Sequence, residues 1–250
     1  MSQLTLHVEL SKLFSSEKKD QDLSICLGHP DFQSFIKRHD LKVSPSDIVH
    51  ALTHASFSHE FHTSHQELAE FFGDAVLQLI ITQELMRLFP MEQEGKLSKL
   101  RSTIVNEKTL AKVARELNLQ DLILVGKGEF KKKTHLQDAV LADSMEALIA
   151  KLFETQGLEF TSQKVLSWIK IAIPLAFDLD QLEHFDAKSR LQEKTLARYK
   201  SLPRYQSEES QEGFKVQLWI NEKLQAEGNF NSKKIGEREL AQQVLIKNEF

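Results

Sequence analysis

Apolar side chains recur about once per helical turn along most of the chain from residue 31 to residue 177. One run contains Phe71, Phe72, Ala75, Val76, Leu79 and Ile80. A second run contains Leu110, Val113, Ala114 and Leu117. This spacing predicts helices, because it places the apolar side chains on one face. Pro90 is expected to end the first of these helices and Pro174 to interrupt the last, because proline lacks a backbone N–H donor.

The pattern changes after residues 178–186, where the apolar periodicity lapses. Residues 187–199 again have helical spacing, but Phe214, Val216, Leu218 and Ile220 then alternate with polar side chains or Trp219. Alternation with a period of two predicts a half-buried strand. A turn is expected at 221–222, a weaker strand follows it, and Ser232 is expected to cap a helix that begins at Lys233.

These patterns predict an all-α domain followed by a small α+β domain of order α-β-β-β-α. We expect an N-terminal extension of unknown role over residues 1–30, the helical domain over 31–178, a linker over 179–186 and the second domain over 187–250. Nine glycines and five prolines in 250 residues make an all-β fold with many turns unlikely to arise from this sequence;.

Composition narrows the class of protein. Hydrophobic residues make up 41% of the chain and charged residues 27%, which is typical of a globular protein;. The single cysteine, Cys26, excludes an internal disulfide and a Cys-based zinc site;. Residues 1–14 do not have the pattern expected of a secretory signal, and the most apolar stretches are shorter than the roughly 20 residues that a membrane span needs;. We therefore expect a cytoplasmic protein with no membrane partner.

The two predicted domains differ in charge. The formal net charge is −4, but residues 187–250 contain 12 Lys and Arg against nine Glu and no Asp, which gives +3. The preceding residues contain 20 basic and 27 acidic side chains, which gives −7. An acidic domain joined to a basic one is typical of a metal or catalytic module attached to a polyanion-binding module, although charge scatter without function would give a similar difference.

Three acidic side chains form a stripe on the helix that opens at Gln66. Glu67, Glu70 and Asp74 stand at i, i+3 and i+7, which places them within an arc of about 60° beside the apolar face;. Gly73 lies in the middle of this helix, where glycine costs about 1 kcal/mol relative to alanine;. Close approach of another backbone or of a substrate would explain it.

A second acidic pair, Asp143 and Glu146, lies one turn apart within the apolar stretch 141–149. Two helices that pack with these edges facing would gather four or five carboxylates around one space. Oxygen ligands without thiols select Mg²⁺ or Mn²⁺, and such a site can activate water for attack on a phosphodiester. The alternative is that each acidic set is an ordinary solvated helix face.

Short motifs surround these carboxylates in a fixed order. Residues 52–57 read Leu-Thr-His-Ala-Ser-Phe, residues 66–74 read Gln-Glu-Leu-Ala-Glu-Phe-Phe-Gly-Asp, and residues 141–146 read Leu-Ala-Asp-Ser-Met-Glu. They resemble the motifs of bacterial ribonuclease III, a family of double-stranded-RNA endonucleases. Further on, residues 188–193, Pro203 with Tyr205, and Ser232 to Glu237 resemble a double-stranded-RNA-binding domain. The resemblance covers residues 31 to 250.

The resemblance implies a role for particular residues. Mg²⁺, with Mn²⁺ as a possible substitute, would be held by Glu70, Asp74, Asp143 and Glu146. Of these, Asp74 and Glu146 would be catalytic. Glu67 and Glu94 would be additional acidic residues of the cleft. RNA would contact Gln192, Glu193, Lys233 and Lys234. Phe71 matches an aromatic that inserts into a partner chain, although it could instead be an ordinary core residue.

The family also implies an activity and partners. We expect a homodimer that cleaves double-stranded RNA to 5′-phosphate and 3′-hydroxyl ends, processes precursor ribosomal RNA and other structured RNAs, and uses no small organic cofactor. This chain departs from the family at Gln66, where the family has Asn, and at Gly236, where it usually has Ala. The expected loop 208–212, between the first two strands, carries three Glu instead of Gly-Pro-x-His, which should weaken RNA binding.

The sequence leaves three alternative hypotheses open. The chain could be a non-catalytic RNA-binding protein on the same fold, although relatives of that kind lose carboxylates that this chain keeps. It could be an unrelated helical metal-dependent phosphohydrolase, which would leave the second domain unexplained. A zinc site could also be built from His54, His59, His62 and His65, but no regular zinc spacing accompanies them.

Overall fold

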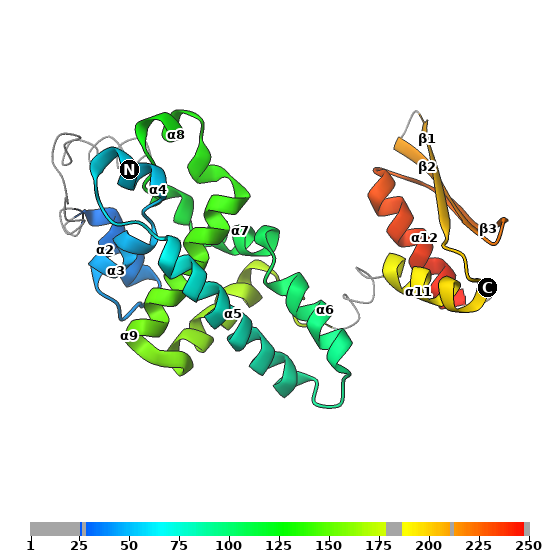
Figure 1. Cartoon of the computed structure of the whole chain (residues 1–250), viewed down its shortest axis with the longest axis horizontal. Helices are drawn as coiled ribbons and strands as arrows, with labels where there is room; N and C mark the ends of the chain where they lie inside the picture. Colours follow the sequence, from blue (N-terminus) through cyan, green and yellow to red (C-terminus); the bar gives the residue numbers. More distant parts are fainter. Residues whose placement is uncertain (1–25, 27–28, 179–186, 211–212, 248–250) are drawn as a thin grey trace. The chain divides into compact units, whose positions relative to one another are not determined.

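Figure 1 shows the computed structural model of the chain, in which the described residues are 26, 29–178, 187–210 and 213–247. They form two compact units, divided between Phe177 and Asp178. The described part of the N-terminal unit is helical, and that of the C-terminal unit is a three-stranded sheet with a helix before it and a helix after it. The predicted fold class is confirmed.

The N-terminal unit consists of helices joined by short connections. Its helices are α2 (Pro30–Arg38), α3 (Pro45–Ala51), α4 (Ala55–Phe61), α5 (Glu67–Leu88), α6 (Glu94–Ile104), α7 (Glu107–Glu116), α8 (Lys127–Lys131) and α9 (Asp138–Ala172). Two 3₁₀ turns, η2 (Leu119–Asp121) and η3 (Thr134–Leu136), flank α8. The long helices α5 and α9 pack against each other (Figure 1).

Local sequence explains several helix boundaries. Asn106 caps α7, because its side-chain oxygen accepts a hydrogen bond from the backbone N–H of Thr109 at 3.0 Å;. Helix α5 ends two residues before Pro90, and α9 ends two residues before Pro174. Pro174 therefore follows a helix rather than interrupting one. The bend in α9 lies instead at Gly157, whose φ of 72° is non-helical;.

Helices α5 and α9 are in close backbone contact at Gly73. A Cβ atom on this residue would lie 1.8 Å from the carbonyl oxygen of Glu146. No side chain fits in that space, so glycine is required in spite of its low helix propensity. The expectation that another backbone approaches Gly73 is confirmed.

The buried face of α5 differs from the predicted one. Val76 and Ile80 are buried as predicted, together with Leu77 and Ile81. The prediction is wrong for the other members of the run, because the structure exposes Phe71, Phe72, Ala75 and Leu79. Helix α5 is apolar on two sides, and the helices of its own unit cover only one of them. In α7, by contrast, all four apolar positions of the second run are buried.

The C-terminal unit has the predicted order of elements. It contains α11 (Ala187–Tyr199), β1 (Arg204–Ser210), β2 (Gly213–Ile220), β3 (Lys223–Phe230) and α12 (Lys233–Lys247). The strands pair antiparallel in the order β1-β2-β3. Asn221 and Glu222 have φ angles of 48° and 62°, and two successive positive φ angles are what a two-residue type I′ hairpin turn requires;.

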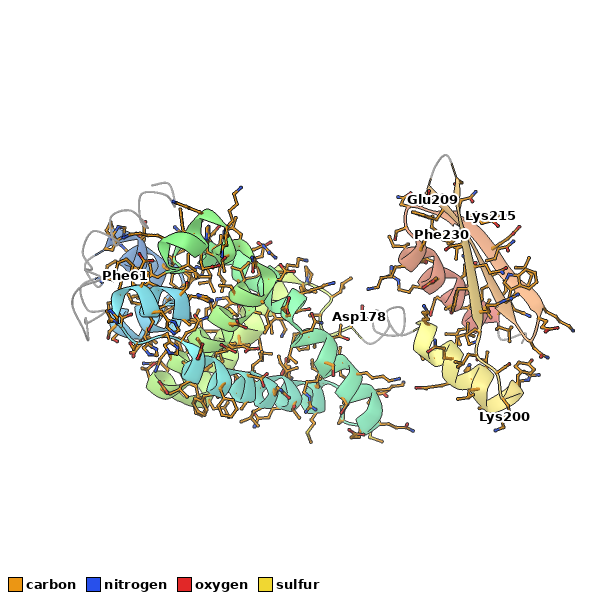
Figure 2. All side chains as sticks on the ribbon, turned by 45° about the horizontal axis from the view of Figure 1, so that its top comes forward. Phe61, Asp178, Lys200, Glu209, Lys215 and Phe230 are labelled. Atoms are coloured by element: carbon orange, nitrogen blue, oxygen red, sulfur yellow. The ribbon has the colours of Figure 1, made fainter. Side chains whose placement is uncertain are left out.

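One side of the sheet packs on the two helices. Val216, Leu218 and Ile220 point into a core that also contains residues of α11 and α12, which confirms the predicted alternation. Phe230 lies beside this core (Figure 2). A Cβ atom on Gly236 would come within 2.6 Å of both Phe230 and Val216. The glycine that replaces the family's alanine is therefore matched to the bulk of Phe230.

The expected acidic loop is largely a strand. Glu208 and Glu209 belong to β1 and stand opposite Lys215 and Phe214 of β2. Figure 2 shows Glu209 and Lys215 near the same end of the hairpin. The loop prediction is therefore wrong for residues 208–210, because the strand extends through them. Residues 211–212 lie outside the described part of the chain, so the position of Glu212 stays untested.

Two other expectations concern residues that the structure does not describe. The predicted linker 179–186 lies wholly outside the described residues, and so does the extension 1–30 apart from Cys26, His29 and Pro30. In the described ranges, none of the helices combines the length and the apolar character needed to cross a membrane.

Candidate metal centre

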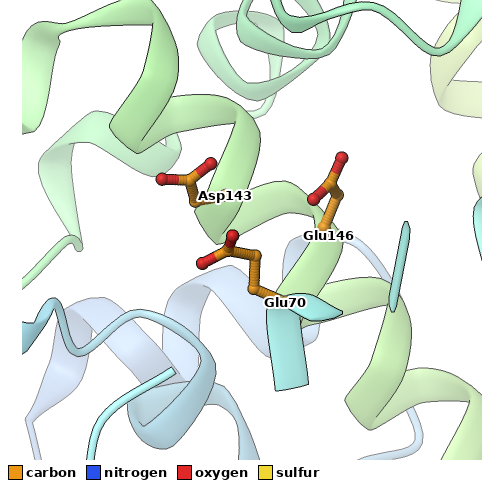
Figure 3. Close-up of side chains that lie close together, drawn as sticks. All are labelled: Glu70, Asp143 and Glu146. Atoms are coloured by element: carbon orange, nitrogen blue, oxygen red, sulfur yellow. The ribbon is translucent and has the colours of Figure 1, made fainter. Parts of the chain in front are cut away.

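Three carboxylates from two helices meet on the surface of the N-terminal unit. Each of Glu70, Asp143 and Glu146 offers an oxygen that lies within 4.8 Å of the oxygens offered by the other two. All three side chains are partly buried. Figure 3 shows Glu70 on α5 beside Asp143 and Glu146 on α9. The structure therefore brings one member of the first predicted acidic set, Glu70, to both members of the second.

The packing of the helices accounts for this arrangement. Asp143 and Glu146 stand one turn apart, so both face the same side of α9;. The backbone contact between Gly73 and Glu146 brings α5 close enough for Glu70, one turn before Gly73, to reach the same space. Because all the donors are carboxylate oxygens, the group is suited to a hard divalent cation.

The electrostatics of the group are unfavourable without a counter-charge. Burial raises the pKa of Glu146, and the nearby charges of Asp74, Asp143 and Glu70 raise it further, to about 8;. Burial likewise raises the pKa of Glu70, with smaller contributions from Asp143 and Glu67. Carboxylates that repel one another in a partly desolvated site would be stabilised by a bound cation.

Asp74 lies next to this group rather than within it. Its charge is the largest electrostatic contribution, after burial, to the raised pKa of Glu146, which places it close to that side chain. The side-chain amide of Gln78 donates to both carboxylate oxygens of Asp74 at 3.1 Å. Gln78 therefore fixes the orientation of Asp74, a contact that sequence analysis did not anticipate.

The remaining acidic candidates separate into near and distant residues. Glu67 is exposed and close enough to raise the pKa of Glu70. Glu94 begins α6 and lines a groove with Leu85 and Phe89 at the far end of α5, about 22 Å along that helix from Glu70;. A single chain therefore does not bring Glu94 to the carboxylate group.

Glu107 is an acidic neighbour that sequence analysis missed. It begins α7, and after burial its charge is the cause that raises the pKa of Asp143. In the sequence, Glu107 is simply a glutamate that follows the helix cap Asn106. Glutamate is common at helix starts because its charge interacts favourably with the helix dipole. Nothing in that signal indicated that α7 begins beside Asp143.

The histidines do not form the alternative zinc site. Among the described residues, which include all four of them, the carboxylates are the only group of three or more ligands close enough to hold an ion. His54 has a different role, because its Nδ1 accepts a hydrogen bond from the backbone N–H of Ser56 at 3.1 Å and so caps α4;.

Phe71 lies on the exposed side of α5. Its side chain is 80% exposed, so it is not a core residue of this unit, and Leu68 beside it is 83% exposed. Phe72 and Leu79 extend the same exposed apolar surface along the helix. We call the surface formed by Leu68, Phe71, Phe72 and Leu79 the α5 apolar face. Contiguous apolar surface of this kind is typical of an interaction site.

The four residues expected to contact RNA all lie on helices of the C-terminal unit. Gln192 is partly exposed and Glu193 exposed on α11, and Lys233 and Lys234 are exposed at the start of α12. The ammonium of Lys233 lies 5.1 Å from the centre of the Phe214 ring, a cation–π contact that holds it near the sheet;. An ion pair of 2.7 Å between Lys188 and Glu237 joins α11 to α12.

Comparison with known proteins identifies the family of the chain. A family model described as Ribonuclease-III-like matches residues 46–173, which include the three clustered carboxylates and Asp74. The chain belongs to this family. Relatives named Ribonuclease 3 extend the similarity beyond the helical unit. The protein from Borreliella burgdorferi is 33% identical over 238 residues, which is 92% of this chain and 96% of the relative.

Other ribonuclease III proteins give the same result. The Ribonuclease 3 of Acinetobacter baumannii is 34% identical over 207 residues, which is 80% of this chain and 88% of the relative. Among solved structures, a nuclease domain of ribonuclease III from Campylobacter jejuni is 35% identical with a TM-score of 0.54 and covers 57% of this chain and 99% of that domain. That domain is described as having a flexible region involved in dimer formation.

Membership of the ribonuclease III family removes one of the earlier alternatives. An unrelated helical phosphohydrolase is excluded, because the relatives match both the helical unit and the unit that follows it. The relatives that match most of the chain are named Ribonuclease 3, so the chain is an endoribonuclease and the non-catalytic RNA-binding alternative on the same fold is not supported.

Proposed function

We propose that this chain is a double-stranded-RNA endonuclease that hydrolyses phosphodiester bonds and leaves 5′-phosphate and 3′-hydroxyl ends. The observation that carries the proposal is the group of Glu70, Asp143 and Glu146, whose oxygens two helices hold within 4.8 Å of one another. The match to proteins named Ribonuclease 3 over most of the chain supports it. We propose precursor ribosomal RNA and other structured RNAs as substrates, cleaved in the cytoplasm.

The donor set supports a divalent metal ion. Its oxygens are hard ligands, and burial first and the neighbouring carboxylate charges second raise the pKa of Glu146, so a doubly charged cation would stabilise the ionised group;. We propose Mg²⁺ as the cofactor, with Mn²⁺ as a substitute, and no organic cofactor. When bound, such an ion supplies an activated water molecule and stabilises the leaving oxygen of a phosphodiester.

Individual side chains have separate tasks in this proposal. Glu70, Asp143 and Glu146 hold the ion, and Asp74 completes the set from its position beside Glu146. Gln78 keeps both oxygens of Asp74 in place, so the Asp74 carboxylate is already oriented when substrate binds;. Asp74 and Glu146 are the catalytic residues that we propose. Glu67, beside Glu70, extends the acidic cleft.

The C-terminal unit is proposed to bind the RNA duplex. Gln192 and Glu193 on α11 would reach a minor groove, where duplex RNA displays 2′-hydroxyls and base edges. Lys233 and Lys234 stand at the N-terminus of α12, where the helix dipole favours an anion such as a phosphate;.

We further propose that the active form is a homodimer joined through the α5 apolar face. The exposed Phe71 and Leu68 would be removed from water in such an assembly;. A second chain is also the arrangement that can bring Glu94 to a cleft, since within one chain about 22 Å of α5 separates Glu94 from Glu70;.

Phe71→Ser in the full chain should convert the dimer to monomer. Loss of a large aromatic side chain from an interface typically costs about 2 kcal/mol or more, and a symmetric dimer loses it from both chains, so we expect an increase of about 1,000-fold in the dimer dissociation constant. Sedimentation equilibrium measures this constant. Ile246→Ser is the control, because Ile246 is also exposed but belongs to the C-terminal unit. Equal dissociation constants for Phe71→Ser and the parent would contradict the proposed interface.

Cleavage of a long RNA duplex tests the activity itself. The parent chain should cleave the duplex in Mg²⁺, cleave it in Mn²⁺ and lose activity in EDTA, because the carboxylates need the cation to act on a phosphodiester. Gel analysis of the products, before and after digestion by an exonuclease that requires a 5′-phosphate, gives the position of the phosphate. Binding of the duplex without any cleavage in Mg²⁺ would favour the non-catalytic alternative.

A further inference from the structure

A hydrogen bond between two buried side chains joins the start of α5 to α9. The hydroxyl of Ser144 donates to Oε1 of Gln66 at 3.2 Å. Ser144 is fully buried and Gln66 is 2% exposed. Buried polar atoms are costly without a partner, so each of these side chains requires the other. Ser144 also lies between two of the clustered carboxylates in sequence, Asp143 and Glu146.

The backbone of Gln66 is fixed on both sides. Its N–H donates to the carbonyl oxygen of Thr53 at 3.0 Å, and its carbonyl oxygen accepts from the N–H of Glu70 at 2.9 Å. Gln66 therefore connects Glu70 directly to the segment before α4. Gln66 and Glu70 are thus joined by both the backbone and a hydrogen bond of the first helical turn.

The side chain of Gln66 does not cap its own helix. Gln66 occupies the N-cap position of α5, where a side-chain oxygen commonly accepts a hydrogen bond from a backbone N–H of the first turn;. No such hydrogen bond is present. The side chain instead extends to Ser144 on α9. Glutamine is one methylene longer than the asparagine of the family motif, and its length is used to reach the neighbouring helix.

Among the contacts that pack α5 on α9, two flank Glu70. One is the backbone contact between Gly73 and Glu146, and the other is the hydrogen bond between Gln66 and Ser144. The two points are about 10 Å apart along α5, and Glu70 lies between them;. The bond at Gln66 is the polar contact at the start of α5, where the helix carries Glu70, and it fixes the separation of this end of α5 from Asp143.

We infer that Gln66 and Ser144 are a positioning pair that sets the separation between the cation ligands on α5 and those on α9. This inference rests on the proposed function, because it assigns the pair to the metal site. Neither side chain is expected to contact the substrate. Their effect is exerted through Glu70 on one helix and through Asp143 and Glu146 on the other.

Ser144→Ala in the full chain tests the pair. We expect affinity for Mn²⁺, measured by calorimetry without RNA, to fall about tenfold, because the carboxylates are no longer held at one separation. The rate constant for cleavage of bound duplex should fall by a similar factor, while the Kd for duplex RNA should stay at the parent's value. Ser167→Ala is the matched control, since Ser167 is an exposed serine of the same helix.

A double variant separates positioning from simple stability. In Gln66→Leu with Ser144→Ala, neither side chain leaves a buried polar atom unpaired, so the Tm should return toward the parent's value. We expect Mn²⁺ affinity to stay low, because the hydrogen bond between residues 66 and 144 is still absent. Ser144→Thr should keep the affinity, because it keeps the hydroxyl, although its extra methyl group lowers the Tm.

Two results would overturn the inference. One is parental Mn²⁺ affinity and cleavage in Ser144→Ala. The other is recovery of Mn²⁺ affinity together with the Tm in the double variant, which would assign the pair to stability alone. A parent chain that neither binds Mn²⁺ nor cleaves duplex would contradict the proposed function, and the inference would fall with it.

Discussion

Glu146→Gln should lower the rate of duplex cleavage by about 1,000-fold or more. Glu146 is the most perturbed of the clustered carboxylates, and its replacement removes a charged oxygen ligand while keeping the volume of the side chain. Loss of a metal ligand removes several kcal/mol of charge stabilisation, and about 1.4 kcal/mol corresponds to a factor of ten in rate. Single-turnover cleavage in Mg²⁺ measures the effect.

Binding of the duplex should survive the same substitution. The proposed RNA contacts lie mainly in the C-terminal unit, so the Kd of Glu146→Gln for duplex RNA should equal the parent's value within about twofold. Glu159→Gln is the control, because Glu159 is an exposed residue of the same helix, and it should cleave at the parental rate. Near-normal cleavage by Glu146→Gln in Mg²⁺ would remove the proposed site from consideration.

The Tm provides a second readout that does not depend on activity. Because the pKa of Glu146 is raised from 4.5 to about 8 in the folded chain, ionisation of this side chain destabilises the fold as pH rises from about 4.5 to 8;. Glutamine cannot ionise. In EDTA, Glu146→Gln should therefore have a higher Tm than the parent, and the difference should widen across this range of pH. A difference that narrows with rising pH would contradict the burial and repulsion described for the site.

Sequence reasoning reached the main elements of the fold because their signals are local. The helical spacing around Leu110 and Val113, the alternation from Val216 to Ile220, and the cap at Ser232 each depend on residues within a few positions of one another. Each of these patterns reflects burial of one face or a hydrogen bond to the nearest turn. The same local information could not show that β1 extends through Glu208 and Glu209.

Burial on α5 was harder to predict because the helix is apolar on two sides. Phe71 and Val76 have equivalent hydrophobic character, but Val76 packs inside the unit and Phe71 points outward. Hydrophobicity alone cannot distinguish a face covered by the same chain from one available to a partner. The family motif, which gave Phe71 a role outside its own chain, carried information that periodicity lacked.

The sequence predicted only part of the candidate metal site, because the site also depends on tertiary packing. Glu70 and Asp143 were identifiable from the residues around each of them, but their separation depends on how α5 and α9 pack. The same packing placed Glu107 beside Asp143 and left Glu94 at the other end of α5. Contacts between elements distant in sequence are set by tertiary structure, so a single sequence gives no direct measure of them.

Gly73→Ala should damage the site without changing any of its ligands. The new Cβ would lie 1.8 Å from the carbonyl oxygen of Glu146 and 2.5 Å from its carbonyl carbon. Both atoms belong to the backbone, so the helices must separate by about 1 Å or more to restore van der Waals contact. A displacement of that size at a catalytic centre can cost about 100-fold in rate, and we expect a loss of about that factor in duplex cleavage.

Gly73→Ala should also lower the stability of the fold, although replacing a helical glycine with alanine usually raises it. Alanine in place of an exposed helical glycine favours folding by about 1 kcal/mol, but overpacking of a close contact typically costs about 1–3 kcal/mol or more. Because the clash at Gly73 involves backbone, we expect the cost to exceed the gain and the Tm to fall by several degrees. Cleavage must then be compared well below the Tm of the variant, with duplex binding measured alongside.

Gly128→Ala is the matched control for this prediction. Gly128 also lies in a helix, α8, but a Cβ atom there would have no other atom within 4 Å. The same chemical change should therefore leave cleavage unaltered and keep or slightly raise the Tm, because only the helix propensity changes. If Gly73→Ala resembled Gly128→Ala in both measurements, α5 and α9 would not be in backbone contact, and the arrangement that brings Glu70 to Asp143 and Glu146 would be wrong.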